Sequence, residues 1–188
     1  GDPLGPPGGT QLRGVTGVPH EPDVRAQPPG LALTNLVAEP SPRDSMAAIG
    51  LAAAILELRD PEAVMGSFAA DHVIGEPELF ADCVREAVVV AQTGYLVTIG
   101  IEPTRPATGF GYIQVGESVA IPGAANGRAV RSFVEKPDEA TARGYLATGE
   151  YRWNAGMFVV KAAVLLELLA TFHPIMAAGL RDIAAEPA

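Results

Sequence analysis

Apolar residues along the chain fall into short continuous runs and longer stretches with helical spacing. Short apolar runs bounded by turn residues are typical of buried strands. Apolar residues three and four positions apart indicate a helix that packs on one side. The pattern predicts strands at 35–39, 64–69 and 95–101, with helices at 46–58 and 77–92 between them.

The order strand, helix, strand, helix, strand is typical of βαβ units and therefore of a parallel sheet. Beyond Pro106 the pattern changes to shorter strands and more closely spaced helices. The expected strands there are 111–115, 130–134 and 156–160, and the expected helices are 138–148, 162–172 and 174–185. The whole pattern predicts an α/β fold.

The first 30 residues differ from the rest of the chain because they contain 7 Gly and 7 Pro. So few apolar residues cannot bury enough surface to offset the entropy lost on ordering the segment. We therefore expect residues 1–30 to be irregular and residues 31–188 to form the folded core.

Composition narrows the classes of function. The 188 residues include 13 Lys and Arg against 22 Asp and Glu, a net charge of −9, which argues against a nucleic-acid partner and against anionic membranes. One cysteine, Cys83, excludes a disulfide framework and a cysteine-based zinc site. It lies on an apolar helix face, where we expect it in the core. With no signal peptide pattern and no apolar run of the roughly 18 residues that a span needs, we expect a cytoplasmic protein.

Asp71 is a candidate metal ligand because it follows the apolar strand 64–69 directly. Ligands of open α/β sheets bind beyond the carboxyl ends of the strands, and divalent cations prefer hard oxygen ligands. The alternative is an aspartate that caps the following turn. Position in the sequence favours neither interpretation.

Polar residues at the ends of later strands could bind a phosphorylated sugar. Lys136 is a compact charge suited to phosphate, and Glu135 can accept hydrogen bonds from hydroxyls. Asn154 offers both a donor and an acceptor, and Gly111 would permit close approach of the main chain to a ligand. Arg43 could meet a phosphate or a base. Each also has a simpler interpretation as a solvated strand end, a turn residue or a surface charge.

The order of five segments resembles the mannose-1-phosphate guanylyltransferases (GDP-mannose pyrophosphorylases), a group of sugar nucleotidyltransferases. The resemblance covers roughly residues 15 to 180. The segments are Glu-Pro-Ser-Pro-Arg-Asp-Ser at 39–45, Ala-Ala-Asp-His at 69–72, Thr-Gly-Phe-Gly-Tyr-Ile at 108–113, Phe-Val-Glu-Lys-Pro at 133–137 and Trp-Asn-Ala-Gly-Met-Phe at 153–158.

The resemblance implies a Rossmann-like nucleotidyltransferase core with a mixed, mainly parallel sheet flanked by helices and incomplete at the N-terminus. It also implies a reaction in which mannose 1-phosphate attacks the α-phosphorus of GTP, giving GDP-mannose and pyrophosphate with the help of Mg²⁺. Metal and lysine would offset the repulsion between the two anionic reactants.

The matched motifs imply a role for each candidate. Asp71 would hold Mg²⁺ at the phosphates, and Lys136 would pair with the sugar phosphate. Gly111 would allow close approach to the sugar, and Glu135 and Asn154 would bind mannose hydroxyls. The segment that borders the nucleotide base would comprise Glu39, Arg43, Asp44 and Ser45, where the last two replace the more usual Asn-Thr.

The chain departs from the family pattern at both ends. The family's glycine-rich triphosphate loop has only an echo at residues 8–13, without a preceding strand or a following lysine. The second metal carboxylate is expected beyond residue 188. We therefore expect the middle of the enzyme, with exposed sheet edges that favour a homo-oligomer. The alternative is a non-catalytic remnant or regulatory module that binds a sugar phosphate or nucleotide sugar.

Overall fold

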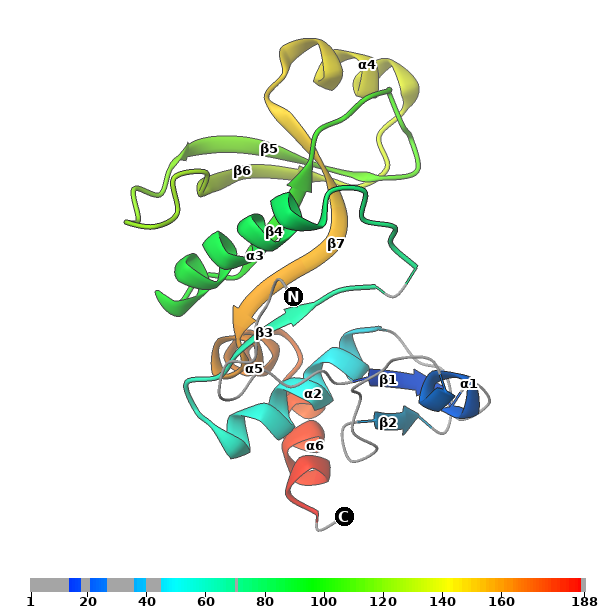
Figure 1. Ribbon diagram of the computed structural model, residues 1–188, viewed down its shortest axis with the longest axis vertical. Helices are drawn as coiled ribbons and strands as arrows, with labels where there is room; N and C mark the ends of the chain where they lie inside the picture. Colours follow the sequence, from blue (N-terminus) through cyan, green and yellow to red (C-terminus); the bar gives the residue numbers. More distant parts are fainter. Residues whose placement is uncertain (1–13, 18–20, 27–35, 40–44, 70, 187–188) are drawn as a thin grey trace. The chain divides into compact units, whose positions relative to one another are not determined.

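A computed structural model of the chain describes residues 14–17, 21–26, 36–39, 45–69 and 71–186, which belong to two compact units (Figure 1). Residues 1–63 and 162–188 contribute to one, here called the helical unit, and residues 64–161 form the other, here called the sheet unit. No helix in the described part of the chain is long and apolar enough to cross a membrane.

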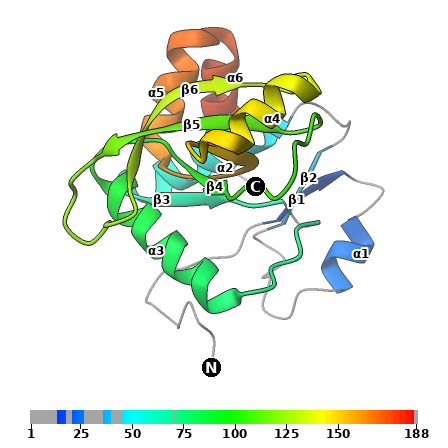
Figure 2. The same ribbon diagram turned by 90° about the horizontal axis from the view of Figure 1, so that it is seen from above.

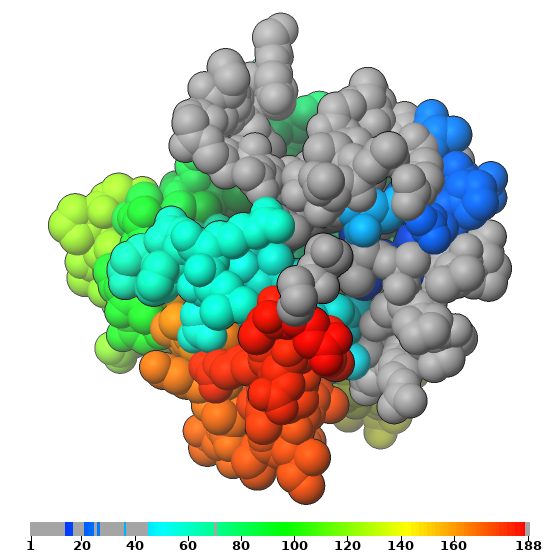
Figure 3. All heavy atoms as spheres, turned by 90° about the horizontal axis from the view of Figure 1, so that it is seen from below, coloured from blue at the N-terminus to red at the C-terminus, as the bar shows by residue number. Residues whose placement is uncertain are grey.

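The helical unit is built on close packing of α2 against α5 and α6 (Figure 3). A Cβ on Gly50 would lie 2.6 Å from Leu180 Cδ1 and 3.1 Å from Leu169 Cδ1, so the absence of a side chain lets the helices approach. A two-stranded parallel sheet of β1 and β2 completes this unit. Its elements are β1 (Gly14–Gly17), α1 (Glu21–Ala26), β2 (Leu36–Glu39), α2 (Ser45–Arg59), α5 (Ala162–Phe172) and α6 (Pro174–Ala185).

The sheet unit is organised around its last strand, β7, which runs through the whole unit (Figure 1). Phe158 and Val159 pair with β3 along one edge of β7 and with β4 along the other. Further along the first edge, β7 pairs with β5, which in turn pairs with β6. The elements are β3 (Val64–Ser67), α3 (Pro77–Gln92), β4 (Val97–Ile101), β5 (Gly111–Ser118), β6 (Arg128–Val134), α4 (Glu139–Thr148) and β7 (Tyr151–Lys161).

The predicted α/β architecture with flanking helices is confirmed, but the expectation of a mainly parallel sheet is wrong for the described strands. Every pairing in the sheet unit is antiparallel, and the parallel pairing is the one between β1 and β2. The reason is that β7 lies between β3 and β4. These two strands run in the same direction, as a βαβ unit requires, but they are not hydrogen-bonded neighbours.

Several local expectations also differ from the structure. The segment 153–156 was expected to precede a strand but lies inside β7, which begins at Tyr151. Cys83, expected in the core, is exposed, and α3 instead buries small residues such as Ala87 and Ala91 against Val159. Both β1 and α1 contain residues of the segment 1–30 that composition predicted to be irregular.

Helices α3 and α4 lie at opposite ends of the β5–β6 hairpin (Figure 2). Near α4, the buried Tyr112 donates a hydrogen bond to the carbonyl of Ala107 at 2.9 Å. Tyr145 of α4 stacks on Tyr151 with ring centroids 3.9 Å apart. These contacts fix the loop that enters β5 and the helix that leaves β6, so the polar turn between β6 and α4 is held from both sides.

That turn has two constraints of its own. Lys136 has a φ of 44°, in the left-handed region that favours glycine, and its N–H donates to the carbonyl of Phe110 at 3.3 Å. Asp138 is the N-cap of α4 and accepts a hydrogen bond from the N–H of Thr141 at 2.7 Å. The hydrogen bonds from Thr141 lower the pKa of Asp138 below its ordinary value of 3.8.

The Asp138 cap predicts a pH-dependent stability. We expect Asp138→Ala to unfold at lower urea concentration than the wild type at neutral pH, because one N–H of α4 loses its acceptor. Since the pKa is lowered in the folded state, this advantage is present above pH 3.8 and declines as the pH falls through the folded-state pKa. As a control, the urea midpoints of Asp138→Asn and Asp138→Ala should differ by the same amount at every pH. A wild-type advantage that does not change in acid would contradict the assignment.

The positive φ of Lys136 predicts that this lysine destabilises the fold. Lys136→Gly should raise the free energy of unfolding by up to about 1 kcal/mol, because glycine adopts the left-handed region without the Cβ clash. Lys136→Ala should give no such gain. Ala120, with a φ of 53°, is the matched control, and Ala120→Gly should stabilise the fold to a similar extent. Urea unfolding measures all three; a gain for Ala120→Gly without one for Lys136→Gly would refute strain at Lys136.

Candidate functional site

Three of the predicted sugar-binding residues meet where β5 begins and β6 ends. Gly111, the first residue of β5, is paired with Asn154 of β7. A Cβ on Gly111 would lie 3.5 Å from the Cβ of Asn154 and 2.7 Å from Oε2 of Glu135. Lys136 follows Glu135 in the same turn. The structure therefore brings Gly111, Glu135, Lys136 and Asn154 together, and we call these four residues the acceptor cluster.

Gly111 forms a floor without a side chain in this cluster. It is buried, and any Cβ would also lie 3.0 Å from Cζ of Phe133. A larger residue would occupy the space between the carboxylate of Glu135 and the side chain of Asn154. Glycine inside a strand often marks a place where a ligand or another backbone approaches closely. The arrangement fits a small polar ligand resting on the main chain.

Asn154 is held in one orientation by its neighbours. Its Oδ1 accepts a hydrogen bond from the N–H of Gly156 at 3.2 Å, and it shares the hydroxyl proton of Thr98 with the carbonyl of Met157, each oxygen lying 3.2 Å from Oγ1. Gly156 has a φ of 72°, and the register of β4 against β7 shifts between Thr98 and Gly100, so the strand is irregular here. With Oδ1 committed, the NH₂ group of Asn154 is the part able to donate to a ligand.

Glu135 and Lys136 form a loose pair at the rim. Their side chains are 58% and 65% exposed, and Oε1 lies 4.0 Å from Nζ. Such a pair contributes little to stability in water, so each charged group can leave the other and contact a ligand instead. The positive φ of Lys136 adds a strained backbone to this turn.

Asp71 lies beyond the end of β3 and is exposed. Strands β3 and β5 follow one another along the same edge of β7, β3 opposite 158–161 and β5 opposite 151–154. The chain leaving β3 is therefore directed toward the start of β5, where Gly111 stands. Among the described residues, no group of three or more His, Cys, Asp or Glu residues could hold a metal ion.

The predicted nucleotide-binding segment lies in the helical unit. Glu39 is the last residue of β2, and Ser45 is the exposed first residue of α2. Arg43 and Asp44 lie outside the described residues, as does the side chain of Glu39. The assignment of these four residues to the base stays a prediction.

Sequence reasoning missed residues that support the cluster. Thr98, which orients Asn154, is a polar residue inside an apolar strand, and that interruption was the available signal. Arg105 lies over the rings of Phe110 and Trp153, with its guanidinium carbon 5.8 and 5.9 Å from their centroids. The two rings meet edge to face at 5.1 Å. These contacts hold the loop that carries the carbonyl of Phe110 to Lys136.

Known proteins share sequence and fold with this chain. A family model described as nucleotidyl transferase matches residues 28–186. The chain is 46% identical over 144 residues to the mannose-1-phosphate guanylyltransferase ManC of Salmonella typhimurium, and 41% identical over 148 residues to the xanthan biosynthesis protein XanB of Xanthomonas campestris. These matches cover 74% and 79% of this chain but 30% of each relative, so the chain spans about a third of their length.

Two solved structures share the fold. One, described as a mannose-1-phosphate geranyltransferase from Thermus thermophilus, superposes with a TM-score of 0.80 at 28% identity, covering 93% of this chain and 49% of the other. A second, described as a mannose-6-phosphate isomerase from Helicobacter pylori, has a TM-score of 0.72 at 27% identity, covering 90% and 63%. Since the family model matches most of the sequence, the chain belongs to the nucleotidyl transferase family of transferases.

Proposed function

We propose that this chain provides the sugar-phosphate site of a mannose-1-phosphate guanylyltransferase, which transfers GMP from GTP to mannose 1-phosphate. The acceptor cluster is the observation that supports this proposal. It combines a carboxylate, an ammonium group and an amide around a buried glycine without a side chain. That set matches the hydroxyls and the phosphate of a sugar phosphate, and the similarity to guanylyltransferases supports the choice of mannose and guanine.

The reaction joins two anions. A phosphate oxygen of mannose 1-phosphate forms a bond to the α-phosphorus of GTP, and the bond from that phosphorus to the bridging oxygen breaks. Pyrophosphate leaves with the electron pair, so GDP-mannose and pyrophosphate are the products. Lys136 would offset the charge of the attacking phosphate, while Glu135 accepts hydrogen bonds from sugar hydroxyls and the NH₂ of Asn154 donates to another. This chain would contribute the positioning of the sugar phosphate and a positive charge beside it.

Asp71 would hold Mg²⁺ through its carboxylate. Magnesium in phosphate sites is commonly held by one or two carboxylates and by the substrate's own phosphate oxygens, and it retains several waters. The ion would neutralise charge on the triphosphate. Glu39, Arg43, Asp44 and Ser45 would border the base, as the order of motifs implies.

The glycine floor predicts a change in binding without a large change in stability. In Gly111→Ala the new Cβ meets the ends of two flexible side chains, Glu135 and Phe133, which can move aside. We expect mannose 1-phosphate to bind at least about tenfold more weakly, because Glu135 leaves its place, while the melting temperature changes little. Gly109→Ala is the control, since no atom lies within 4 Å of its Cβ. Equal affinities of Gly111→Ala and wild type in calorimetry would argue against the floor.

The decisive experiment is titration calorimetry of the folded chain with GDP-mannose, with and without Mg²⁺. The proposal predicts magnesium-dependent binding that Asp71→Asn reduces while the melting temperature stays the same.

Lys136→Ala should weaken the binding of mannose 1-phosphate about tenfold or more and change GTP binding much less, because the charge of Lys136 would face the sugar phosphate. The proposal would be overturned if the folded chain bound neither GDP-mannose nor mannose 1-phosphate. Equal losses of mannose 1-phosphate and GTP binding in Lys136→Ala would contradict the role of Lys136.

A further inference from the structure

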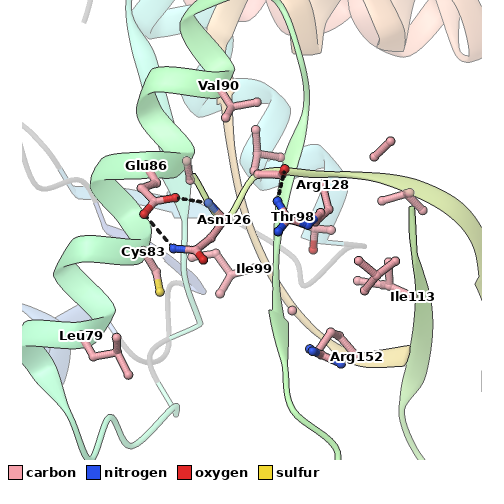
Figure 4. Close-up of a pocket in the computed structure, with 17 residues that line it drawn as sticks. Leu79, Cys83, Glu86, Val90, Thr98, Ile99, Ile113, Asn126, Arg128 and Arg152 are labelled. Carbon is pink, nitrogen blue, oxygen red and sulfur yellow. Dashed lines mark hydrogen bonds between the residues drawn. The ribbon is translucent and has the colours of Figure 1, made fainter. Parts of the chain in front are cut away.

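The sheet unit contains a cavity of about 520 Å³ between α3, β4 and the β5–β6 hairpin (Figure 4). Its size falls within the range of small-molecule sites in proteins. Aliphatic side chains form most of its wall, among them Leu79, Val90, Ile99, Ile113 and Val130. No residue of the acceptor cluster lines it, although Ile113 and Arg152 are two residues from Gly111 and Asn154 along their strands.

Two arginines stand in this apolar wall. Nη1 of Arg152 donates to the carbonyls of Gly149 and Tyr151 at 3.0 and 2.8 Å. Nη1 of Arg128 donates to the carbonyls of Ala125 and Gly127 at 2.9 and 3.0 Å. Figure 4 shows both arginines among the lining residues. Within the described part of the chain, neither forms an ion pair with a carboxylate. Main-chain carbonyls thus fix both guanidinium groups without cancelling their charge.

These arginines differ from others in the structure. Arg143 and Arg181 are paired with Glu139 and Glu57, respectively. In a chain with a net charge of −9, two unpaired guanidinium groups in one cavity are not a consequence of overall composition.

The neighbouring residues preserve this arrangement. A Cβ on Gly100 would lie 2.8 Å from Cβ of Arg152, so glycine there leaves space for the arginine stem across β4. Glu86 is the one acidic residue among those that line the cavity. Its two carboxylate oxygens accept from the main-chain N–H and from Nδ2 of Asn126, each at 2.9 Å. Its charge is therefore directed at the hairpin loop, which it ties to α3.

We propose that this cavity is a second binding site, which takes a small organic anion with an apolar or aromatic body. The anionic group would meet the free guanidinium nitrogens of Arg152, whose planar fork suits an oxyanion. The body would lie on the aliphatic wall, on the side that leads toward Arg128. The inference concerns a site separate from the acceptor cluster and does not depend on the proposed function.

The test uses 1-anilinonaphthalene-8-sulfonate, a fluorescent probe with an aromatic body and one sulfonate. Fluorescence titration of the folded chain should show saturable binding. Arg152→Met, which keeps the stem and removes the charge, should weaken it about tenfold or more. Arg131→Met is the matched control, because Arg131 is an exposed arginine of β6 outside the cavity, and it should leave the affinity within about twofold.

A second variant keeps the proposal testable if Arg152→Met is unstable. Val130 is 53% exposed at the cavity, so Val130→Trp can fill the cavity at small cost to the fold and should abolish probe binding. Glu135→Gln, in the acceptor cluster, should not change it. Binding that survives Val130→Trp would overturn the proposal. Loss of binding in Glu135→Gln would also overturn it, since the probe would then occupy the acceptor cluster.

Discussion

Hydrogen bonding of β7 along both of its edges is the interaction on which the sheet unit depends. Phe158 and Val159 each pair with β3 on one side and β4 on the other, and further along the strand β5 takes the place of β3. Val159 and Val160 are completely buried. Without this strand, β3 and β4 would lose their partners and β5 would keep only β6. The last strand of the unit in sequence, β7, therefore joins all the others.

The same strand carries residues of both proposed sites. Where β7 changes partners it becomes irregular, with a positive φ at Gly156 and a shift of register against β4. Asn154 lies at this irregularity, and Arg152 lies two residues away in the wall of the cavity. A regular strand would direct the N–H of Gly156 into a ladder, whereas here it orients the amide of Asn154. Bulges are common next to active sites, and this irregularity orients the amide that we assign to the proposed sugar-phosphate site.

For the binding of an anion, the position of individual positive groups matters more in this protein than its net negative charge. The guanidinium groups of Arg152 and Arg128 are positioned by main-chain carbonyls near them in sequence. Positive groups held in this way need no carboxylate partner to stay in place, so they remain able to attract an anion. An acidic surface elsewhere does not prevent this, because salt screens charges beyond roughly 10 Å.

The sequence by itself determined most of the local structure and the membership of the acceptor cluster. The helices 77–92, 162–172 and 174–185 match α3, α5 and α6, because helical spacing and flanking Pro or Gly are local signals. Gly111, Glu135, Lys136 and Asn154 could be named because their motifs are short and contiguous. Only the tertiary structure decided that β7 separates β3 from β4, that Thr98 orients Asn154 and that Cys83 is exposed. These features depend on contacts between segments about 60 to 90 residues apart or on which face of a helix is covered, and no local pattern of residues records either.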